Sequence, residues 1–441
     1  AAEIESWLVK EAGSIPPKAG LETHIAAQEC FEASALPTHP AGQVLPSGGD
    51  HWSFSRRRPA GVVTVIAPFN FPLILSIRSV APALALGNAV LFKPDPRTAV
   101  GAGASLIRVF EEAGLPAGVF QLLNGAADVG EAVCSADEVR VISFTGSTPA
   151  GRKVGELAAK HLKRAHLELG GNNALIVLPG VDVAKAASAG AFASWMHQGQ
   201  ICMTTGRHIV HESVYDAYVA ALVEKANHLP VGDPSTGQVA LGPIIDENQA
   251  SKVQQIVDET VAQGGTVAAG GTREGLFFKP TVMTNLTQDS SAWKNEIFGP
   301  VAPVMKFSTI DEAIAIAVVG PLLSLAFDKP PASTMGLAVV LSGIALTWNY
   351  VFNWLFERWE LRQTVRGRSF ARRLTHGAGF EGGLVVILLP VMSLWLDISV
   401  ATALLANLGL LAFFFFYAIA FTWCFDRVFG LPASAQAGPA S

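Results

Sequence analysis

The stretch Val62–Pro72, VVTVIAPFNFP, decides the fold class, because it predicts a buried strand that runs into a turn and a helix. Residues Val62–Ala67 are β-branched or small, and a short run of this kind between turn signals is typical of a strand in a parallel sheet. The pattern of Leu73–Leu86 predicts the helix that follows. Strands that alternate with helices predict an α/β fold in which crossover helices join parallel strands.

The same alternation continues along the chain and forms two sets. Further strands are predicted at Ala89–Phe92, Val119–Leu123 and Val141–Phe144, and the second set begins with a strand at Ala174–Leu178. Further helices are predicted at Thr98–Glu112, Asp128–Cys134, Pro149–Lys160, Ala184–His197, Val214–Ala226 and Asn248–Gln263.

The bulk composition excludes several classes of protein. With 441 residues the chain is long enough for two or three domains. A net charge of -5 and the lack of a basic stripe argue against a nucleic-acid partner. The four cysteines are spaced too widely for a disulfide framework or a zinc site, which favours a reducing compartment and no metal. Residues Ala1–Gly20 contain neither a signal peptide nor an initiator Met, which suggests a fragment.

The turn after Val141–Phe144 is a candidate phosphate site. Its sequence, FTGSTPAG at Phe144–Gly151, places Gly146 and Ser147 between a strand and a helix start. A glycine lets backbone approach a phosphate, and the helix N-terminus offers free N–H groups. For this motif alone, a purely structural turn is the alternative.

Glu168 is a candidate general base, in the sequence LELGGN at Leu167–Asn172. At a strand end in a cleft, burial would raise the pKa of its carboxyl and make it a usable base. The alternative is a solvated glutamate at the end of a strand.

Cys202 is a candidate nucleophile, in the sequence GQICMTTGR at Gly199–Arg207. The flanking glycines and a predicted helix start at Cys202 favour a reactive thiolate. The alternative is an inert thiol in the core.

Asn70 is a candidate oxyanion donor, because it lies between Pro68 and Pro72 at a strand end. A rigid amide in such a place can stabilise negative charge on oxygen. The alternative is an ordinary turn asparagine.

Together and in this order, the motifs resemble the aldehyde dehydrogenase superfamily, and most of all its benzaldehyde and aromatic aldehyde dehydrogenase branch. The resemblance covers residues from about Glu3 to Ala317. It is carried by PFNFP (Pro68–Pro72), FTGST (Phe144–Thr148), LELGG (Leu167–Gly171), GQICMTTGR (Gly199–Arg207) and EIFGPV (Glu296–Val301).

The resemblance implies the oxidation of a small aldehyde to the carboxylic acid. The Cys202 thiolate attacks the aldehyde carbon, while the Asn70 amide and the backbone N–H of Cys202 hold the oxyanion. Glu168 activates the water that releases the acid from a thioester. An aromatic substrate is implied by the family branch.

The resemblance also implies NAD as the cofactor, bound by a Rossmann-like domain. Lys93 resembles the lysine that binds the adenosine ribose. The other implied cofactor residues are Gly125 near the adenine, Gly146 and Ser147 by the pyrophosphate, Glu296 and Phe298 at the nicotinamide ribose, and Phe144 and Leu169. Many NAD-preferring members bind the ribose 2′-hydroxyl with a Glu where this chain has Pro96, beside Asp95, so NADP stays open.

The expected domains of the α/β part are both shortened relative to the family. Residues 1–169 are predicted as an NAD(P)-binding domain without the family's N-terminal region, and residues 170–317 as a catalytic domain cut at its C-terminal end. Family members continue past EIFGPV with closing strands and a strand that pairs subunits. Its loss argues against a homo-oligomer, and the loss of core strands puts activity in question.

Beyond Ala317 the sequence predicts an all-α transmembrane tail, residues 318–426, and a disordered end, residues 427–441. The runs Thr334–Phe356, Gly377–Leu396 and Ala401–Phe425 meet the ~20-residue criterion for a span, and Ala313–Phe327 is shorter. A basic loop contains Arg358, Arg362, Arg366, Arg368, Arg372 and Arg373. The positive-inside rule places this loop in the cytoplasm. Four passes through lipid would put the enzyme part on the cytoplasmic side of the inner membrane.

Three polar residues are candidates for transport within these helices. An acid such as Glu381 inside a span is costly and often carries protons, although a solvated place near the interface is the alternative. Asn349 and Asn353 share a helix face and can bond across helices.

Residues from about Val318 to Asp426 resemble the proteobacterial antimicrobial compound efflux family, also called the bacterial transmembrane pair domain. The resemblance is carried by Trp348–Asn353, Glu357, His376–Gly383 and Trp423–Asp426. It implies export of biocides such as chlorhexidine against protons. The Glu-Gly pair that normally begins the family's first helix is replaced here by Asp311–Ala313.

Three hypotheses therefore stand: a membrane-tethered aldehyde dehydrogenase, a proton-coupled efflux protein with an inert enzyme remnant, and a chimera in which neither half is complete. Both resemblances break at one point with no visible linker. Because a selected fusion more often joins whole domains, this favours the chimera as the origin.

Overall fold

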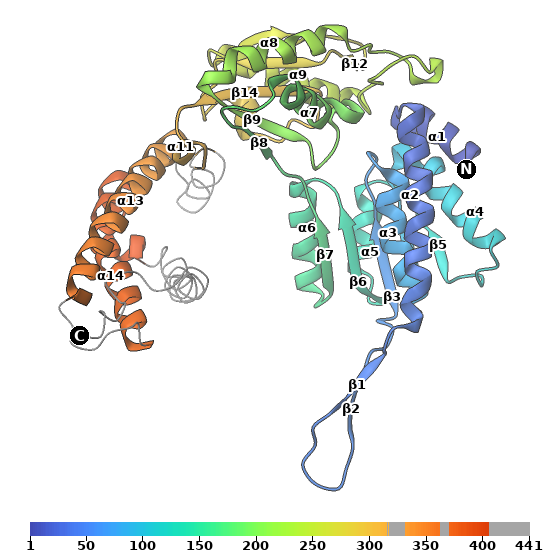
Figure 1. Cartoon of the computed structure of the whole chain (residues 1–441). Coiled ribbons are helices and arrows are strands. Elements are labelled where there is room, and N and C mark those ends of the chain that lie inside the picture. The colour runs from blue at the N-terminus through green and yellow to red at the C-terminus, as the bar shows by residue number, and fades with distance from the viewer. Residues whose placement is uncertain (315, 317–330, 362–369, 405–441) are drawn as a thin grey trace, which may run out of the picture. The chain divides into compact units, whose positions relative to one another are not determined.

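The computed structural model describes residues 1–314, 316, 331–361 and 370–404 (Figure 1), and the chain divides into two compact units. The first unit runs from Ala1 to Lys306 and contains two five-stranded sheets. The second unit runs from Phe307 to Ser441. Each unit is described by itself.

The first sheet is fully parallel, with the strand order β5-β4-β3-β6-β7. Counted from its first strand, this is the 3-2-1-4-5 order of a dinucleotide-binding domain, so the order reverses between β3 and β6. The strands are β3 (Val62–Ile66), β4 (Ala89–Lys93), β5 (Phe120–Leu122), β6 (Val139–Thr145) and β7 (Arg164–Glu168).

Helices connect these strands and build the core around them. Strand β3 is buried along almost its whole length, as expected for a central parallel strand that is covered on both faces. Leu8, Val65, Ile77 and Phe92 belong to the same buried cluster, which joins the N-terminal helices to the sheet. The helices are α1 (Ala2–Ala12), α2 (Pro16–Ala35), α3 (Pro72–Ala85), α4 (Ser105–Glu112), α5 (Ala127–Ser135) and α6 (Thr148–Lys160).

The second sheet has the order β10-β13-β14-β9-β8 and is mixed, because β10 pairs antiparallel with β13. Its core includes Trp195 and Tyr218, which are fully buried. The strands are β8 (Asn173–Val177), β9 (Thr205–His211), β10 (Thr266–Ala269), β13 (Thr281–Thr284) and β14 (Val301–Phe307). The connecting helices are α7 (Val183–Trp195), α8 (Glu212–His228), α9 (Glu247–Ala262) and the short α10 (Ser291–Lys294), and β11 (Arg273–Glu274) pairs with β12 (Phe277–Phe278).

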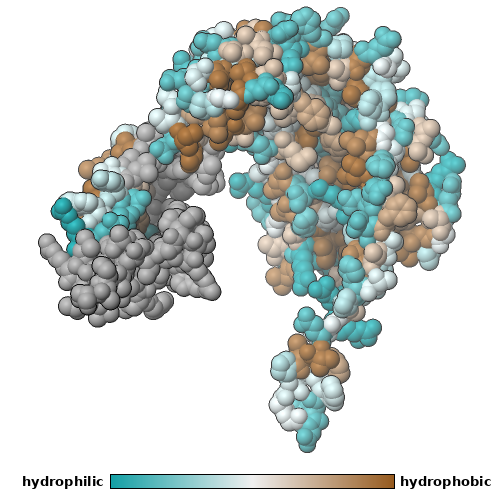
Figure 2. Space-filling model, in the orientation of Figure 1, coloured by the Kyte–Doolittle hydropathy of each residue, from teal (hydrophilic) through white to brown (hydrophobic). Residues whose placement is uncertain are grey.

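A two-stranded hairpin, β1 (Gly42–Leu45) with β2 (Ser53–Arg56), extends from the first unit. It exposes the apolar side chains of Val44, Trp52 and Phe54, and Figure 2 shows hydrophobic surface on it. Strand β8 is an edge strand and also exposes Ile176.

The described part of the second unit consists mainly of two long helices, α13 (Pro331–Leu361) and α14 (Phe370–Leu396), after the short α11 (Ile310–Ile314). Within the residues that the structure describes, one helical segment, Leu374–Leu396, is long and apolar enough to cross a membrane. The predicted run Thr334–Phe356 is helical. Most of the predicted runs Ala313–Phe327 and Ala401–Phe425 lies outside the described residues, as does 427–441.

The α/β fold, the Rossmann-like first sheet and every listed helix and strand of the α/β part are confirmed, with small differences at element ends. The helix predicted at Thr98–Glu112 begins with a π-helical turn, Ala99–Ala104. The helix predicted to reach His197 ends at Trp195, because His197 and Gln198 adopt positive φ angles of 48° and 56°. Helices α1 and α2 and strands β7, β9, β10, β13 and β14 were not predicted from the sequence.

Candidate active site

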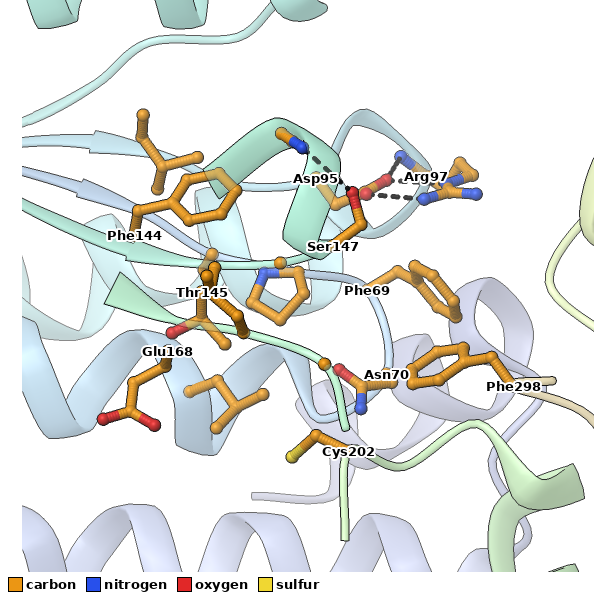
Figure 3. Close-up of a pocket in the computed structure, with 18 of the residues that line it drawn as sticks. Phe69, Asn70, Asp95, Arg97, Phe144, Thr145, Ser147, Glu168, Cys202 and Phe298 are labelled. Carbon is orange, nitrogen blue, oxygen red and sulfur yellow. Dashed lines mark hydrogen bonds and ion pairs between the residues drawn. The ribbon is translucent and has the colours of Figure 1, made fainter. Parts of the chain in front are cut away.

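A cavity of about 370 Å³ lies at the carboxyl ends of the strands of the first sheet. It is lined by residues that follow β3, β4, β6 and β7, and on its other side by residues of α9 and of the loop before β14. In open parallel sheets, ligands bind in this position, where the strand order reverses. The cavity contains three predicted catalytic residues, Asn70, Glu168 and Cys202, which Figure 3 shows around it.

Asn70 reaches the cavity from the turn between β3 and α3. It is 3% exposed, and the adjacent Pro72 is the first residue of α3, where the missing proline N–H costs nothing. The backbone carbonyl of Asn70 accepts a hydrogen bond of 2.7 Å from the buried Lys18 Nζ. The buried turn therefore places the Asn70 side chain beside the cavity.

Cys202 does not lie at a helix start, and that prediction is wrong. It lies in a tight turn between the short 3-10 helix Met196–Gly199 and strand β9, with its side chain partly buried. Gly199, at φ 67°, is packed so closely against the carbonyl of Gly299 that a side chain would collide with it. The Asn173 amide donates to the Cys202 carbonyl at 3.0 Å, which anchors the turn to β8. The thiol thus owes its position to turns and not to a helix dipole.

Glu168 is the last residue of β7 and lines the cavity, but it is not buried as predicted. Its side chain is 49% exposed and lies 3.3 Å from His166 Nε2. The strand end lies at the edge of the sheet, where solvent reaches the carboxylate. The backbone carbonyl of Glu168 accepts from Gly146 N at 3.0 Å, which ties this residue to the neighbouring strand.

The predicted phosphate turn forms the start of α6, and it contributes Phe144, Gly146 and Ser147 to the cavity. Ser147 is the N-cap of α6, and its hydroxyl accepts from Ala150 N at 3.5 Å. Lys93, at the end of β4, is 6% exposed and also lines the cavity. Burial lowers its pKa, whereas the carboxylates of Asp95 and Asp128 act in the opposite direction.

Glu296 and Phe298 close the cavity from the second sheet. The Glu296 carboxylate lies over Gly170, where any side chain would collide with it, and accepts from Gly171 N at 3.3 Å. Partial burial raises the pKa of Glu296, although Gly171 N–H and Lys252 lower it. Phe298 has a strained φ of 53° and its ring packs edge-on against Phe69 at 5.9 Å.

The structure does not bring all predicted residues together. Leu169 lines the cavity with the residues above, but Gly125, in the loop after β5, is not part of its lining. Asn349, Asn353 and Glu381 belong to the second unit. There Asn353 donates to Asn349 at 2.6 Å along α13, and it bonds with His376 of α14 at 2.9 Å, as expected for a bond across helices. Glu381 is 8% exposed within α14.

Several cavity residues were missed from the sequence. Gln249 donates to the carbonyl of Phe298 at 2.9 Å, and Lys252 follows it one turn later on α9. Arg97 lies over the Phe69 ring at 4.3 Å and pairs with Asp95 and Asp246. These residues lie in segments without a motif. For Gln249 and Lys252, their spacing along the predicted helix Asn248–Gln263 offered a weak signal. Arg97 bridges the loop after β4 and the N-cap of α9.

Two family models match the chain. The aldehyde dehydrogenase family matches residues 1–318, and the family described as chlorhexidine efflux transporter matches residues 307–362 and 368–431. The two matches overlap in residues 307–318.

Similar proteins support the first match. A vanillin dehydrogenase of an Amycolatopsis strain is 63% identical over 317 residues, which cover 72% of this chain and 65% of that protein. A benzaldehyde dehydrogenase [NAD(+)] of Pseudomonas putida is 46% identical, over 71% of this chain and 65% of that protein. The crystal structure of an NAD-dependent benzaldehyde dehydrogenase from Corynebacterium glutamicum is 43% identical with a TM-score of 0.67, over 72% of this chain and 70% of that one. The chain thus spans about two thirds of the length of the relatives it matches.

Proposed function

The chain belongs to the aldehyde dehydrogenase family, and on that premise we propose that it oxidises aromatic aldehydes to carboxylic acids with NAD(P) through a thioester on Cys202. One observation carries the proposal: a cysteine, an asparagine and a glutamate surround one cavity at the carboxyl ends of a dinucleotide-binding sheet. The relatives named vanillin and benzaldehyde dehydrogenase suggest the aromatic class.

In the proposed acylation step, the Cys202 sulfur bonds to the aldehyde carbon and the carbonyl oxygen becomes an oxyanion. The Asn70 amide and the Cys202 backbone N–H donate to that oxygen. Donors that are fixed before the reaction stabilise such charge most effectively, and the buried turn at Asn70 provides this. Loss of hydride from the same carbon leaves the thioester.

In the proposed deacylation step, Glu168 takes a proton from water, which attacks the thioester carbon. The carbon–sulfur bond breaks, the acid leaves and the Cys202 thiolate is restored. The half-exposed carboxylate has access to the solvent that supplies the water. In this step we propose that the Glu168 side chain leaves its contact with His166 and turns towards Cys202.

The residues around the cavity fit NAD(P). When bound, its nicotinamide supplies the hydride acceptor of the oxidation. We assign Gly146 and Ser147, at the N-terminus of α6, to the pyrophosphate, since free helix N–H groups favour anions. The remaining assigned residues are Lys93, Phe144, Leu169, Glu296 and Phe298, with Gly125 outside the cavity lining.

The choice between NAD and NADP depends on the loop after β4. No carboxylate stands at Pro96, but the neighbouring Asp95 is held by Arg97 through contacts of 2.7 and 2.8 Å. Arg97 also pairs with Asp246, so this cluster of two carboxylates and one guanidinium keeps a net negative charge. That charge disfavours a 2′-phosphate, so we propose NAD as the preferred cofactor, with NADP as a weaker substitute.

The aromatic substrate class is supported by the walls of the cavity. Phe69, which is not assigned to the cofactor, lines it and packs against Phe298, and rings of this kind pack well against an aromatic ligand. The test is the formation of NADH, followed by absorbance, when the purified full chain meets benzaldehyde or vanillin. Well-folded protein that binds NAD but forms no NADH with either aldehyde would overturn the proposal.

For the C-terminal part, we propose a membrane-embedded region at residues 318–426, surrounded by lipid, next to α/β domains at 1–169 and 170–317 and before a free end at 427–441. The apolar segment Leu374–Leu396 and the match to an efflux family support this. We place the region in the inner membrane and the enzyme part on the cytoplasmic side. Fractionation of cells that express the full chain tests the location. We do not expect a homo-oligomer, because the match to the family ends at residue 318, before the strand with which family members pair their subunits.

A second candidate function is proton-coupled efflux by this region, and the family match favours it. We propose Glu381 as the proton carrier, with Asn349 and Asn353 as part of a polar path that the bond to His376 supports. Chlorhexidine-dependent proton flux in vesicles, lost in Glu381→Gln, is the expected result. A junction sequence at residues 307–318 that is absent from independent isolates would instead establish a chimera.

A further inference from the structure

A buried ion pair on α2 lies directly behind the Asn70 turn. Lys18 is 3% exposed and Glu22 is fully buried, and the two side chains are hydrogen-bonded to each other one helical turn apart. Neither residue lines the cavity at Asn70. Burying a charge costs desolvation free energy unless the group is paired and hydrogen-bonded. A buried ion pair at this position therefore points to a specific role.

The other side-chain contacts of the pair are with the Asn70 turn and the start of α3, and with Ser14 in the loop before α2. Lys18 Nζ donates to the Asn70 carbonyl at 2.7 Å and to Ser14 Oγ at 3.0 Å, and it lies 4.3 Å from the centre of the Phe71 ring. Glu22 Oε2 accepts from Leu73 N at 3.1 Å and from Ile74 N at 3.4 Å.

The pair therefore holds the backbone from the Asn70 carbonyl to the first turn of α3. The N-cap of α3 is Phe71, which has no side-chain capping bond. Glu22 replaces that cap from another helix by accepting the free N–H groups of the first turn. Lys18 fixes the carbonyl of the residue whose amide faces the cavity.

The same part of the chain also contacts the loop before Cys202. Gln198 Nε2 donates to the Gly13 carbonyl at 3.1 Å, and the His197 ring packs edge-on against Phe71 at 5.6 Å. His197 and Gln198 both have positive φ angles, so this loop needs support from its neighbours. The loop before Cys202 thus contacts both the end of α1 and the Asn70 turn.

We infer that the Lys18–Glu22 pair is a positioning device, which fixes the Asn70 amide relative to Cys202 and so speeds the acylation step without touching substrate. The inference rests on the proposed function. It assigns Lys18 and Glu22 as positioning residues that act through Asn70. A shift of about 1 Å in such a donor can cost on the order of 10²-fold in rate.

The test is a double-mutant cycle on the full chain. The single variants Glu22→Gln and Lys18→Met, Asn70→Ala, and each combination with Asn70→Ala are compared by the rate of the first NADH burst with benzaldehyde. We expect a fall of roughly 10- to 10²-fold for each single variant of the pair, with NAD affinity changed less than about twofold. In the Asn70→Ala background the same substitutions should change the burst rate by less than about twofold, because the group they position is gone.

A matched control separates positioning from general damage. Thr260 is buried on α9, and its hydroxyl accepts from Ala292 N at 2.9 Å, away from the cavity. Thr260→Val should lower the free energy of unfolding but leave the burst rate as it is. If Lys18→Met does not fold, Glu22→Gln, which keeps the shape and one acceptor oxygen, carries the test alone.

Two results would overturn the inference. Equal losses of burst rate in the wild-type and Asn70→Ala backgrounds would show that the pair does not act through Asn70. Unchanged amide hydrogen exchange at Leu73 and Ile74 in Glu22→Leu, which removes both acceptor oxygens, would show that Glu22 does not hold the turn. This exchange measurement needs no activity, so it distinguishes a failed inference from a failed proposed function, in which the wild-type chain itself forms no NADH.

Discussion

Asn70 and Glu168 face the same cavity from two regions of opposite character. Asn70 is 3% exposed in a turn that buried charges hold from behind, whereas the Glu168 side chain is 49% exposed at the end of an edge strand. The difference matches the two tasks that we propose. An oxyanion donor gains from rigidity and from the exclusion of water, while a base that activates water needs access to it.

Cys202 lies where the two regions meet, so its removal should have the largest effect. We expect Cys202→Ala to lower kcat/KM for benzaldehyde by at least about 10³-fold, because both proposed steps use its sulfur. NADH absorbance measures the rate, and NAD binding should not change. Cys134→Ala, in the buried face of α5, is the matched control and should keep its activity. A Cys202→Ala protein that still oxidises aldehyde at a tenth of the normal rate would exclude the thioester.

Loss of the exposed region's carboxylate should stop the reaction after its first half. We expect Glu168→Gln to lower steady-state turnover by about 10²- to 10⁴-fold, because Glu168 is the group that we propose takes the proton from water. The burst of NADH should remain, since acylation does not use this group. Glu156→Gln, on the exposed face of α6, should have no effect. If the burst disappears together with turnover, Glu168 serves the first step and the division of tasks is wrong.

Loss of the buried region's amide should act on the opposite half. We expect Asn70→Ala to lower the burst rate itself by about 10²- to 10³-fold, which is the usual cost of one oxyanion donor. Stopped-flow measurement of NADH gives that rate. Asn227→Ala, at an exposed place on α8, is the control. A normal burst followed by slow turnover would assign Asn70 to deacylation instead.

The sequence predicted which residues line the cavity, but it did not predict which residues support them from behind. Strands, helices and motif residues followed from local periodicity and from turn chemistry, and ten of the eleven residues assigned to catalysis or cofactor line one cavity. The support behind Asn70 could not be predicted, because Lys18 and Glu22 are more than 45 residues away from it and belong to no motif. Burial of Glu168 was wrongly expected, since leucine neighbours in a strand point to the opposite face from the residue between them.

The motif around Cys202 shows a second limit of sequence reasoning. Its last residue, Arg207, donates to the Asn172 carbonyl at 2.7 and 3.1 Å and so joins the two glycine-rich motifs. A family motif therefore contains both residues that take part in the reaction and residues that hold the fold. The contacts in the structure are needed to tell the two kinds apart.

Acid should lower the stability of the α/β part through two buried histidines. Burial lowers the pKa of His208 to about 3 and that of His197 well below 6.5. Because the folded pKa lies below the unfolded one, these histidines support the fold above pH 6.5 and that support is lost as the pH falls towards 3. Below pH 6.5, each of these histidines should lower the free energy of unfolding by up to about 1.4 kcal/mol for each unit that the pH falls. Denaturant unfolding at pH 7 and pH 5 measures this.

Two substitutions give that acid effect a control. His208→Gln should remove its share of the pH dependence, because the variant has no proton to take up on unfolding, while the exposed His39→Gln should not. An equal slope of stability against pH in all three proteins would mean that other groups dominate the acid response.

The smallest expected effect belongs to His166, the only contact of the Glu168 side chain among the ion pairs of the described residues. Both side chains are largely exposed, and exposed pairs of this kind contribute about 0–1 kcal/mol. Since we propose that the carboxylate leaves His166 to serve water at Cys202, His166→Ala should leave turnover within about fivefold of the wild type, and any change should be an increase at low ionic strength. Turnover at two salt concentrations measures it, with His161→Ala, at the C-cap of α6, as the control. A loss as large as that of Glu168→Gln would mean that His166 holds Glu168 in its working position, and that the exposed region, like the buried one, depends on a residue behind the reacting group.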